Sequence, residues 1–108
     1  MADITFKRVF HPIGQGAFFT EHFITTQNCL HIVYDCGSMS RKRINEEISE
    51  YASSNFKNEH IACIFISHFD MDHVNGLDEL RKDFTVNNRT LVFVPFFYSI
   101  SKTARKLS

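Results

Sequence analysis

Four side chains that could bind a metal ion lie within six residues of this sequence, in the run HFDMDH at positions 68–73. They are His68, Asp70, Asp72 and His73, and they directly follow the apolar run IACIFIS. Because alternate residues of an extended chain share a face, the first three should point to one side, whereas His73 must turn with the chain. Two metal ions about 3.5–4 Å apart could then be bound from one loop. His68 and Asp70 would bind one ion, and Asp72 and His73 would bind the other.

Imidazole and carboxylate ligands suit Zn²⁺, Mn²⁺ or Fe²⁺, and we expect two divalent ions, with Zn²⁺ preferred. The run contains no thiolate ligand, which indicates a catalytic type of site rather than structural zinc. A simpler interpretation remains open. Asp70 and Asp72 could cap the next helix, and the two histidines could be polar loop residues.

The elements that must position this run can be predicted from the hydrophobic pattern. Period-two alternation and β-branched or aromatic residues predict three antiparallel strands over residues 4–10, 17–25 and 29–34. Apolar residues at helical spacing predict a helix over 40–53, and the apolar run 61–66 predicts a strand buried on both faces. A short helix over 76–84 and a strand over 90–94 complete an α/β or α+β fold with a large sheet.

Composition excludes several classes of protein. The 108 residues suit a single domain, and 44% hydrophobic residues can form a core. The formal net charge is zero, so no overall field attracts nucleic acid or an anionic membrane. No apolar run is long enough to span a bilayer and the start does not read as a signal peptide, so we expect a cytoplasmic protein without membrane contacts. Three cysteines without C-x-x-C spacing argue against disulfides and thiolate zinc.

Three short motifs carry a family resemblance. The stretch 67–77, SHFDMDHVNGL, resembles the signature loop of the metallo-β-lactamase-fold hydrolases, in the H-x-D-x-D-H variant of the competence-associated DNA uptake proteins. The turn IGQG at 13–16 is similar to the V-G-Q-G turn of that subgroup, and VYDCG at 33–37 is similar to its I-D-x-G strand end. The motifs occur in the same order as in that subgroup, and the resemblance covers about residues 10–94.

The resemblance implies an αββα sandwich and a metal-dependent hydrolase, with phosphodiester or nucleic-acid substrates. Its metal ligands would be the four side chains of HFDMDH, and Asp72 would also orient or deprotonate the attacking water. Asp35 would be an acidic residue behind the ligands that fixes the loop. The turn glycines of the motifs would let the chain pass close to the site, and they are Gly14, Gly16, Gly37 and Gly76.

The sequence departs from the family pattern at two places, one before the loop and one after it. Ala17 stands where the subgroup carries an acidic residue, and no histidine occurs after His73 to complete the metal site. We therefore expect residues 1–98 to be the N-terminal half of such a domain, with a polar, basic tail at 99–108. The histidines outside the loop, at 11, 22, 31 and 60, are expected to have strand or surface roles.

Two hypotheses of different classes agree with these patterns. The first is a metal-dependent hydrolase, a possible nuclease or phosphodiesterase, that is incomplete without a missing half of the domain. The second is a non-catalytic truncated or interaction module that retains part of the fold. Under either hypothesis the phenylalanine-rich face of the sheet would lie open to water or to a partner, and we expect the missing half or a second copy of the chain to cover it.

Overall fold

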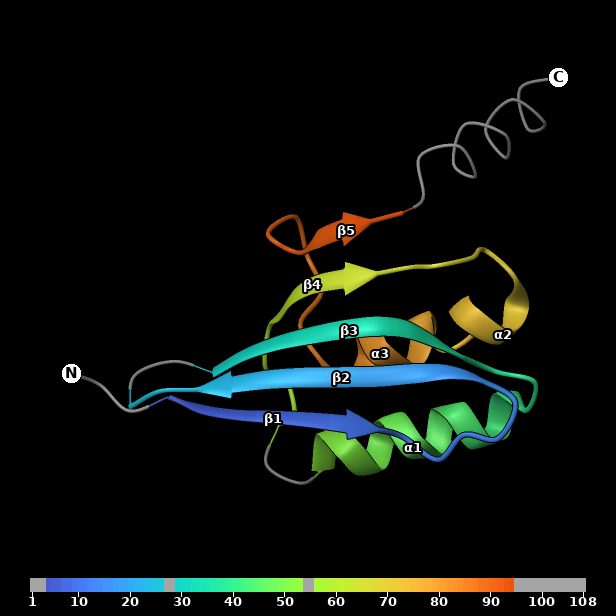
Figure 1. Ribbon diagram of the computed structural model, residues 1–108, viewed down its shortest axis with the longest axis horizontal. Coiled ribbons are helices and arrows are strands. Elements are labelled where there is room, and N and C mark those ends of the chain that lie inside the picture. The colour runs from blue at the N-terminus through green and yellow to red at the C-terminus, as the bar shows by residue number, and fades with distance from the viewer. Residues whose placement is uncertain (1–3, 27–28, 54–55, 95–108) are drawn as a thin grey trace, which may run out of the picture.

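Five strands form one mixed sheet in the computed structural model, which describes residues 4–26, 29–53 and 56–94. The strands lie side by side in chain order (Figure 1). They are β1 (Thr5–Phe10), β2 (Gly16–Ile24), β3 (Cys29–Ser38), β4 (Ile61–Phe65) and β5 (Leu91–Phe93), and the helices are α1 (Arg41–Ser53), α2 (Met71–Val74) and α3 (Leu77–Asp83). The predicted α/β or α+β class is confirmed at this level, and the arrangement is not specific to the metallo-β-lactamase sandwich.

The first three strands form the predicted antiparallel meander. Phe6 pairs with Phe23, and Phe10 pairs with Phe19, across β1 and β2. Each strand is rich in aromatic and β-branched side chains, which suit a pleated and half-buried surface. The register between β2 and β3 shifts between Phe18 and Phe19, where β2 has an irregularity.

The helix α1 packs on one face of the sheet, as its hydrophobic spacing predicted. Ser40 begins it, since its hydroxyl oxygen accepts a hydrogen bond of 3.2 Å from the amide of Arg43. Ile44, Ile48 and Ala52 recur every four residues and are fully buried in the core. The core also contains buried residues of β3, β4 and α3, among them Val33, Ile64 and Leu80.

The strand β4 is parallel to both of its neighbours, β3 and β5. We predicted that it would be buried on both faces, and this prediction is wrong. Ile64 is buried on the side of the helices, whereas Cys63 and Phe65 on the other side are only half-buried. The reason is that, among the described residues, the helices cover one face of the sheet only, and Figure 1 views the sheet from the uncovered face.

None of the helices in the described part of the chain is long and apolar enough to cross a membrane. The polar, basic tail that we predicted at 99–108 lies outside the described residues.

Candidate functional site

The HFDMDH run lies where the chain leaves β4 and enters α2. We predicted an extended loop, and this prediction is wrong beyond Asp70, because Met71–Val74 forms a turn of helix. Asp70 stands at the N-cap position in an extended conformation, but its side chain makes no capping hydrogen bond to the helix. The side chain of Asp72 therefore follows helical geometry and does not share a face with His68 and Asp70 by alternation.

Asp35 holds this segment against the end of β3. Its carboxylate accepts hydrogen bonds from the amide of Ser67 at 2.7 Å and from the hydroxyl of Ser67 at 2.5 Å. The same carboxylate lies 3.1 Å from Nδ1 of His73. Asp35 adopts a left-handed backbone conformation, with φ of 56°, which aspartate tolerates better than most residues. A buried carboxylate with these partners ties the end of β3 to both sides of the loop.

Three of the four predicted ligands lie close together, and they are His68, Asp72 and His73. The rings of His68 and His73 lie 5.1 Å apart, and Nε2 of His73 lies 3.9 Å from the carboxylate of Asp72. No three of the four have ligand atoms that all lie within 4.8 Å of one another, within the part of the chain that the structure describes. Binding of two divalent ions by this loop stays a prediction.

Close backbone contacts hold α2 in place. A Cβ atom on Gly37 would lie 2.6 Å from backbone atoms of both Asp72 and His73, so only glycine allows this approach. Sequence reasoning missed Asn75, whose side chain accepts a hydrogen bond from the amide of Ser38 at 3.0 Å and donates one to its carbonyl at 2.7 Å. The Asn75 side chain thus pairs with the backbone of Ser38 as a neighbouring strand would, and this fixes α2 to the end of β3.

A hollow of about 310 Å³ lies beside the loop, at the carboxyl ends of β3, β4 and β5. Its polar wall includes Asp35 and Ser67, and its apolar wall includes Tyr34, Phe65 and Phe93. The carboxyl ends of parallel strands are a common location for binding sites. The hollow therefore connects the loop with the uncovered face of the sheet.

A row of five aromatic rings crosses that uncovered face, with one ring from each strand. Successive ring centroids lie 4.4, 5.1, 4.9 and 4.7 Å apart. The strand register places each ring directly opposite the next, and the row consists of Phe10, Phe19, Tyr34, Phe65 and Phe93.

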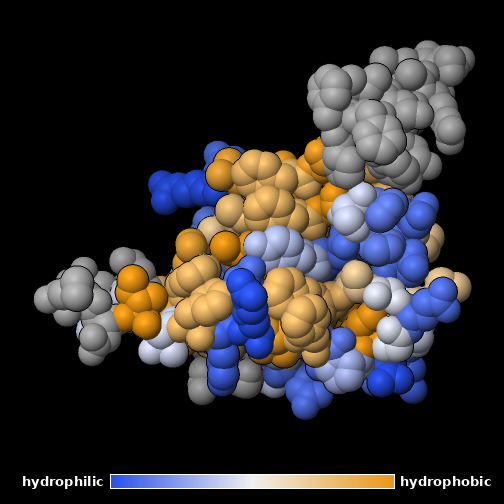
Figure 2. Space-filling model, in the orientation of Figure 1, coloured by the Kyte–Doolittle hydropathy of each residue, from blue (hydrophilic) through white to orange (hydrophobic). Residues whose placement is uncertain are grey.

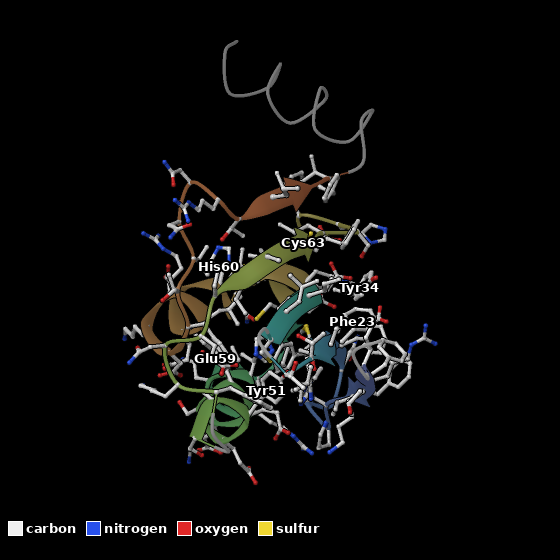
Figure 3. The ribbon with its side chains drawn as sticks, turned by 90° about the vertical axis from the view of Figure 1, so that its left-hand side faces the viewer. Phe23, Tyr34, Tyr51, Glu59, His60 and Cys63 are labelled. Carbon is white, nitrogen blue, oxygen red and sulfur yellow. The ribbon has the colours of Figure 1, made fainter. Side chains whose placement is uncertain are left out.

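Further apolar side chains flank the row, and Figure 2 shows hydrophobic colours over most of this surface. Figure 3 shows Phe23 and Tyr34 on the side of the sheet that faces away from Tyr51 and Glu59. We call this surface the aromatic face, and it comprises the row together with Phe6, Phe23, Leu30, Ile32, Cys63 and Leu91.

A second polar cluster lies at the opposite end of β3, and sequence reasoning missed it. Cys29, His31 and Glu59 have ligand atoms that all lie within 4.8 Å of one another. The C-x-H spacing could have indicated that Cys29 and His31 share a face of the strand. Glu59 could not have been predicted with them, because only the pairing of β3 with β4 brings it close.

Comparison with known proteins corrects the family assignment. Residues 10–99 match the family model described as Anti-Pycsar protein Apyc1. No curated protein and no solved structure matches the chain. The match is to a different family from the metallo-β-lactamase hydrolases, so the resemblance that we inferred from three short motifs is wrong.

The predicted hydrolase of phosphodiesters or nucleic acids is wrong with it, and the catalytic role of Asp72 rested on that assignment alone. Short motifs are weak evidence of a family, because each can also arise from the demands of a turn or of a strand end. Since the matched region covers most of the sequence, the chain belongs to the family of the anti-Pycsar protein Apyc1.

Proposed function

We propose that this chain acts against the Pycsar defence system as a binding module, and that it binds a protein partner through the aromatic face. The family description supports the first part, because it names an anti-Pycsar protein. A single observation carries the second part. Five strands each contribute one ring to a continuous aromatic row, on a face that no helix among the described residues covers.

The exposed apolar area of the aromatic face suits an interface. Five of its side chains are 43–80% exposed, and they are Phe10, Leu91, Phe93, Phe6 and Leu30. At roughly 200 Å² for each large side chain, they expose on the order of 500 Å² of apolar surface. This is comparable with the largest apolar patch of a typical monomer, about 300–600 Å². It is enough for the apolar centre of an interface that buries about 800 Å² on each partner.

The charged groups Arg8 and Glu21 on this face are paired with each other, so a partner that covers them leaves neither charge without a counter-ion. Glu21 is buried, and its carboxylate lies 3.3 Å from Nε of Arg8. A hydrogen bond to Glu21 raises the pKa of the Tyr34 hydroxyl, which therefore stays neutral. Covering a carboxylate that already has these partners leaves no unpaired charge in the interface.

The hollow at the end of the aromatic row gives the interface a polar rim. A partner that covers Phe65 and Phe93 would also reach Asp35 and Ser67, which line the same hollow. Interfaces commonly combine an apolar centre with a polar rim that determines orientation. We infer that the loop residues beside the hollow contribute to the choice of partner.

The proposal is tested by placing a charge on the aromatic face. Phe10→Lys changes a side chain that is 80% exposed, so folding should be little affected, but an ammonium group would lie on the aromatic row. Met39→Lys is the matched control, because Met39 is 68% exposed and lies outside the sheet. In cells that carry a functional Pycsar system, we expect the wild type and Met39→Lys to suppress the defence and Phe10→Lys to fail.

Sedimentation of the purified chain identifies the kind of partner. A wild-type dimer that Phe10→Lys converts to a monomer would identify the partner as a second copy of the chain. A wild-type monomer that suppresses the defence would indicate a different protein. Equal suppression of the defence by Phe10→Lys and Met39→Lys, with far-ultraviolet circular dichroism showing both folded, would refute the aromatic face as the binding surface.

A further inference from the structure

The cluster of Cys29, His31 and Glu59 offers three different ligand atoms at one point. Cys29 and His31 lie at the start of β3, and Glu59 lies just before β4. Sγ of Cys29 is 3.4 Å from Nε2 of His31, and the same nitrogen is 2.6 Å from Oε1 of Glu59. Asp35, beside the HFDMDH loop, is six residues further along β3 than Cys29 and four further than His31, or about 13–20 Å at roughly 3.3 Å per residue. The two places are therefore separate.

These distances are close to those of a tetrahedral metal site. Zinc bonds to sulfur at about 2.3 Å and to imidazole nitrogen at about 2.0–2.1 Å, which places two such ligands roughly 3.5 Å apart. The separation of 3.4 Å between Cys29 and His31 already agrees with this value. The carboxylate of Glu59 would have to move back by roughly 0.7 Å to reach zinc geometry. Its side chain is 35% exposed, so it has room to do so.

The remaining nitrogen of His31 has the partner that a metal-binding histidine needs. Its Nδ1 lies 3.2 Å from the hydroxyl of Tyr51, and that hydroxyl lies 3.3 Å from Nδ1 of His22. With a metal on Nε2, Nδ1 of His31 would carry a proton and donate it to Tyr51, which would donate in turn to His22. Such outer hydrogen bonds orient metal-binding imidazoles.

Aromatic rings hold the imidazole of His31 in place. Its ring is 1% exposed and lies edge-on to Phe56, with centroids 4.8 Å apart, and 5.7 Å from the ring of Phe84. Figure 3 shows Tyr51 and Glu59 on the helix side of the sheet, away from the aromatic face. A partner on the aromatic face would therefore leave this cluster uncovered.

We propose that Cys29, His31 and Glu59 form a three-ligand site for a borderline-soft divalent cation of the zinc class. Sulfur, imidazole and carboxylate together favour Zn²⁺ over Mg²⁺ or Ca²⁺, which prefer oxygen ligands. Three protein ligands leave a fourth position, and the exposed side of Glu59 is where water or another ligand would enter.

Titration of the reduced full chain with Co²⁺ tests the proposal. Cobalt bound by a thiolate gives a charge-transfer absorption band in the near ultraviolet, and cobalt bound only by imidazole and carboxylate does not. The HFDMDH run contains no cysteine, so ions bound there give no such band. We expect the band in the wild type, its displacement by Zn²⁺, and its loss in Cys29→Ser.

Cys63→Ser is the matched control, because Cys63 is also half-buried but lies on the aromatic face. This variant should keep the band. Glu59→Gln keeps the thiol and loses a charged ligand, so it should keep the band with an affinity at least about 10-fold lower. A wild type that gives no band with excess Co²⁺, or a band that survives in Cys29→Ser, would overturn the proposal. Either result would leave a hydrogen-bonded structural cluster as the explanation.

Discussion

Acidification should destabilise this protein through a buried histidine. The side chain of His11 is 3% exposed and its ring stacks on Phe18, with centroids 4.1 Å apart. Its Nε2 lies 2.8 Å from the hydroxyl of Thr20, and the carboxylate of Glu47 lies 3.6 Å from Nδ1. Burial lowers the pKa of His11 from 6.5 to about 4. The folded state therefore prefers the neutral imidazole.

The direction and size of the effect come from linkage. The unfolded chain binds a proton at His11 below pH 6.5, whereas the folded chain does so only near pH 4. The stability that neutral His11 contributes is fully present above the unfolded pKa of 6.5, and it is lost as the pH falls towards the folded pKa of about 4. Between pH 6.5 and about pH 5, roughly 1.36 kcal/mol per unit gives a loss of about 2 kcal/mol in the free energy of unfolding. Burial also lowers the pKa of His22, which adds a loss of the same sign.

Urea unfolding at about pH 7 and about pH 5 measures this loss. The control is His11→Gln, which keeps an amide for Thr20 but cannot titrate. From about pH 7 to about pH 5, the free energy of unfolding of His11→Gln should fall by about 2 kcal/mol less than that of the wild type. The fall that remains in His11→Gln comes from His22 and the carboxylates. Equal losses in the two proteins, or a titration of His11 near pH 6.5 by nuclear magnetic resonance, would refute the reasoning.

Three further experiments test the core and the loop. Ile48→Ala removes a fully buried side chain and should lower the free energy of unfolding in urea by about 3 kcal/mol. Ile4→Ala is the control, because Ile4 is 65% exposed, and it should lower the free energy of unfolding by about 0.5 kcal/mol or less. Gly37→Ala would place Cβ 2.6 Å from the backbone of α2, so we expect a loss of about 1–3 kcal/mol and faster hydrogen exchange of the α2 amides; unchanged exchange would contradict the close contact. For the metal prediction at the loop, Asp72→Asn and His68→Ala should each retain less divalent metal than the wild type after dialysis, and equal metal content in all three would show that the loop is not a metal site.

The sequence by itself determined the elements, because their signals are local. Helical spacing of Ile44 and Ile48 predicted α1, and alternation predicted the three strands of the meander, since each pattern depends only on neighbouring residues. The short helix α2 was missed because four residues are too few to show a period. We predicted burial of β4 on both faces from its apolar run. Such a run can equally well pack against helices on one face and lie open on the other.

Only the tertiary structure decided which side chains meet, because these contacts depend on register between strands that are distant in the sequence. The aromatic row needs five strands to pair so that one ring of each falls in line. Asp35 meets Ser67 and His73 only because β4 ends opposite Tyr34, so the chain that leaves β4 passes beside Asp35 of β3. Glu59 reaches His31, 28 residues away, for the same reason at the other end of these strands. The hydrophobic pattern of the sequence specifies which side chains share a face of a helix or strand. The register of one strand against the next is determined by packing across the whole sheet.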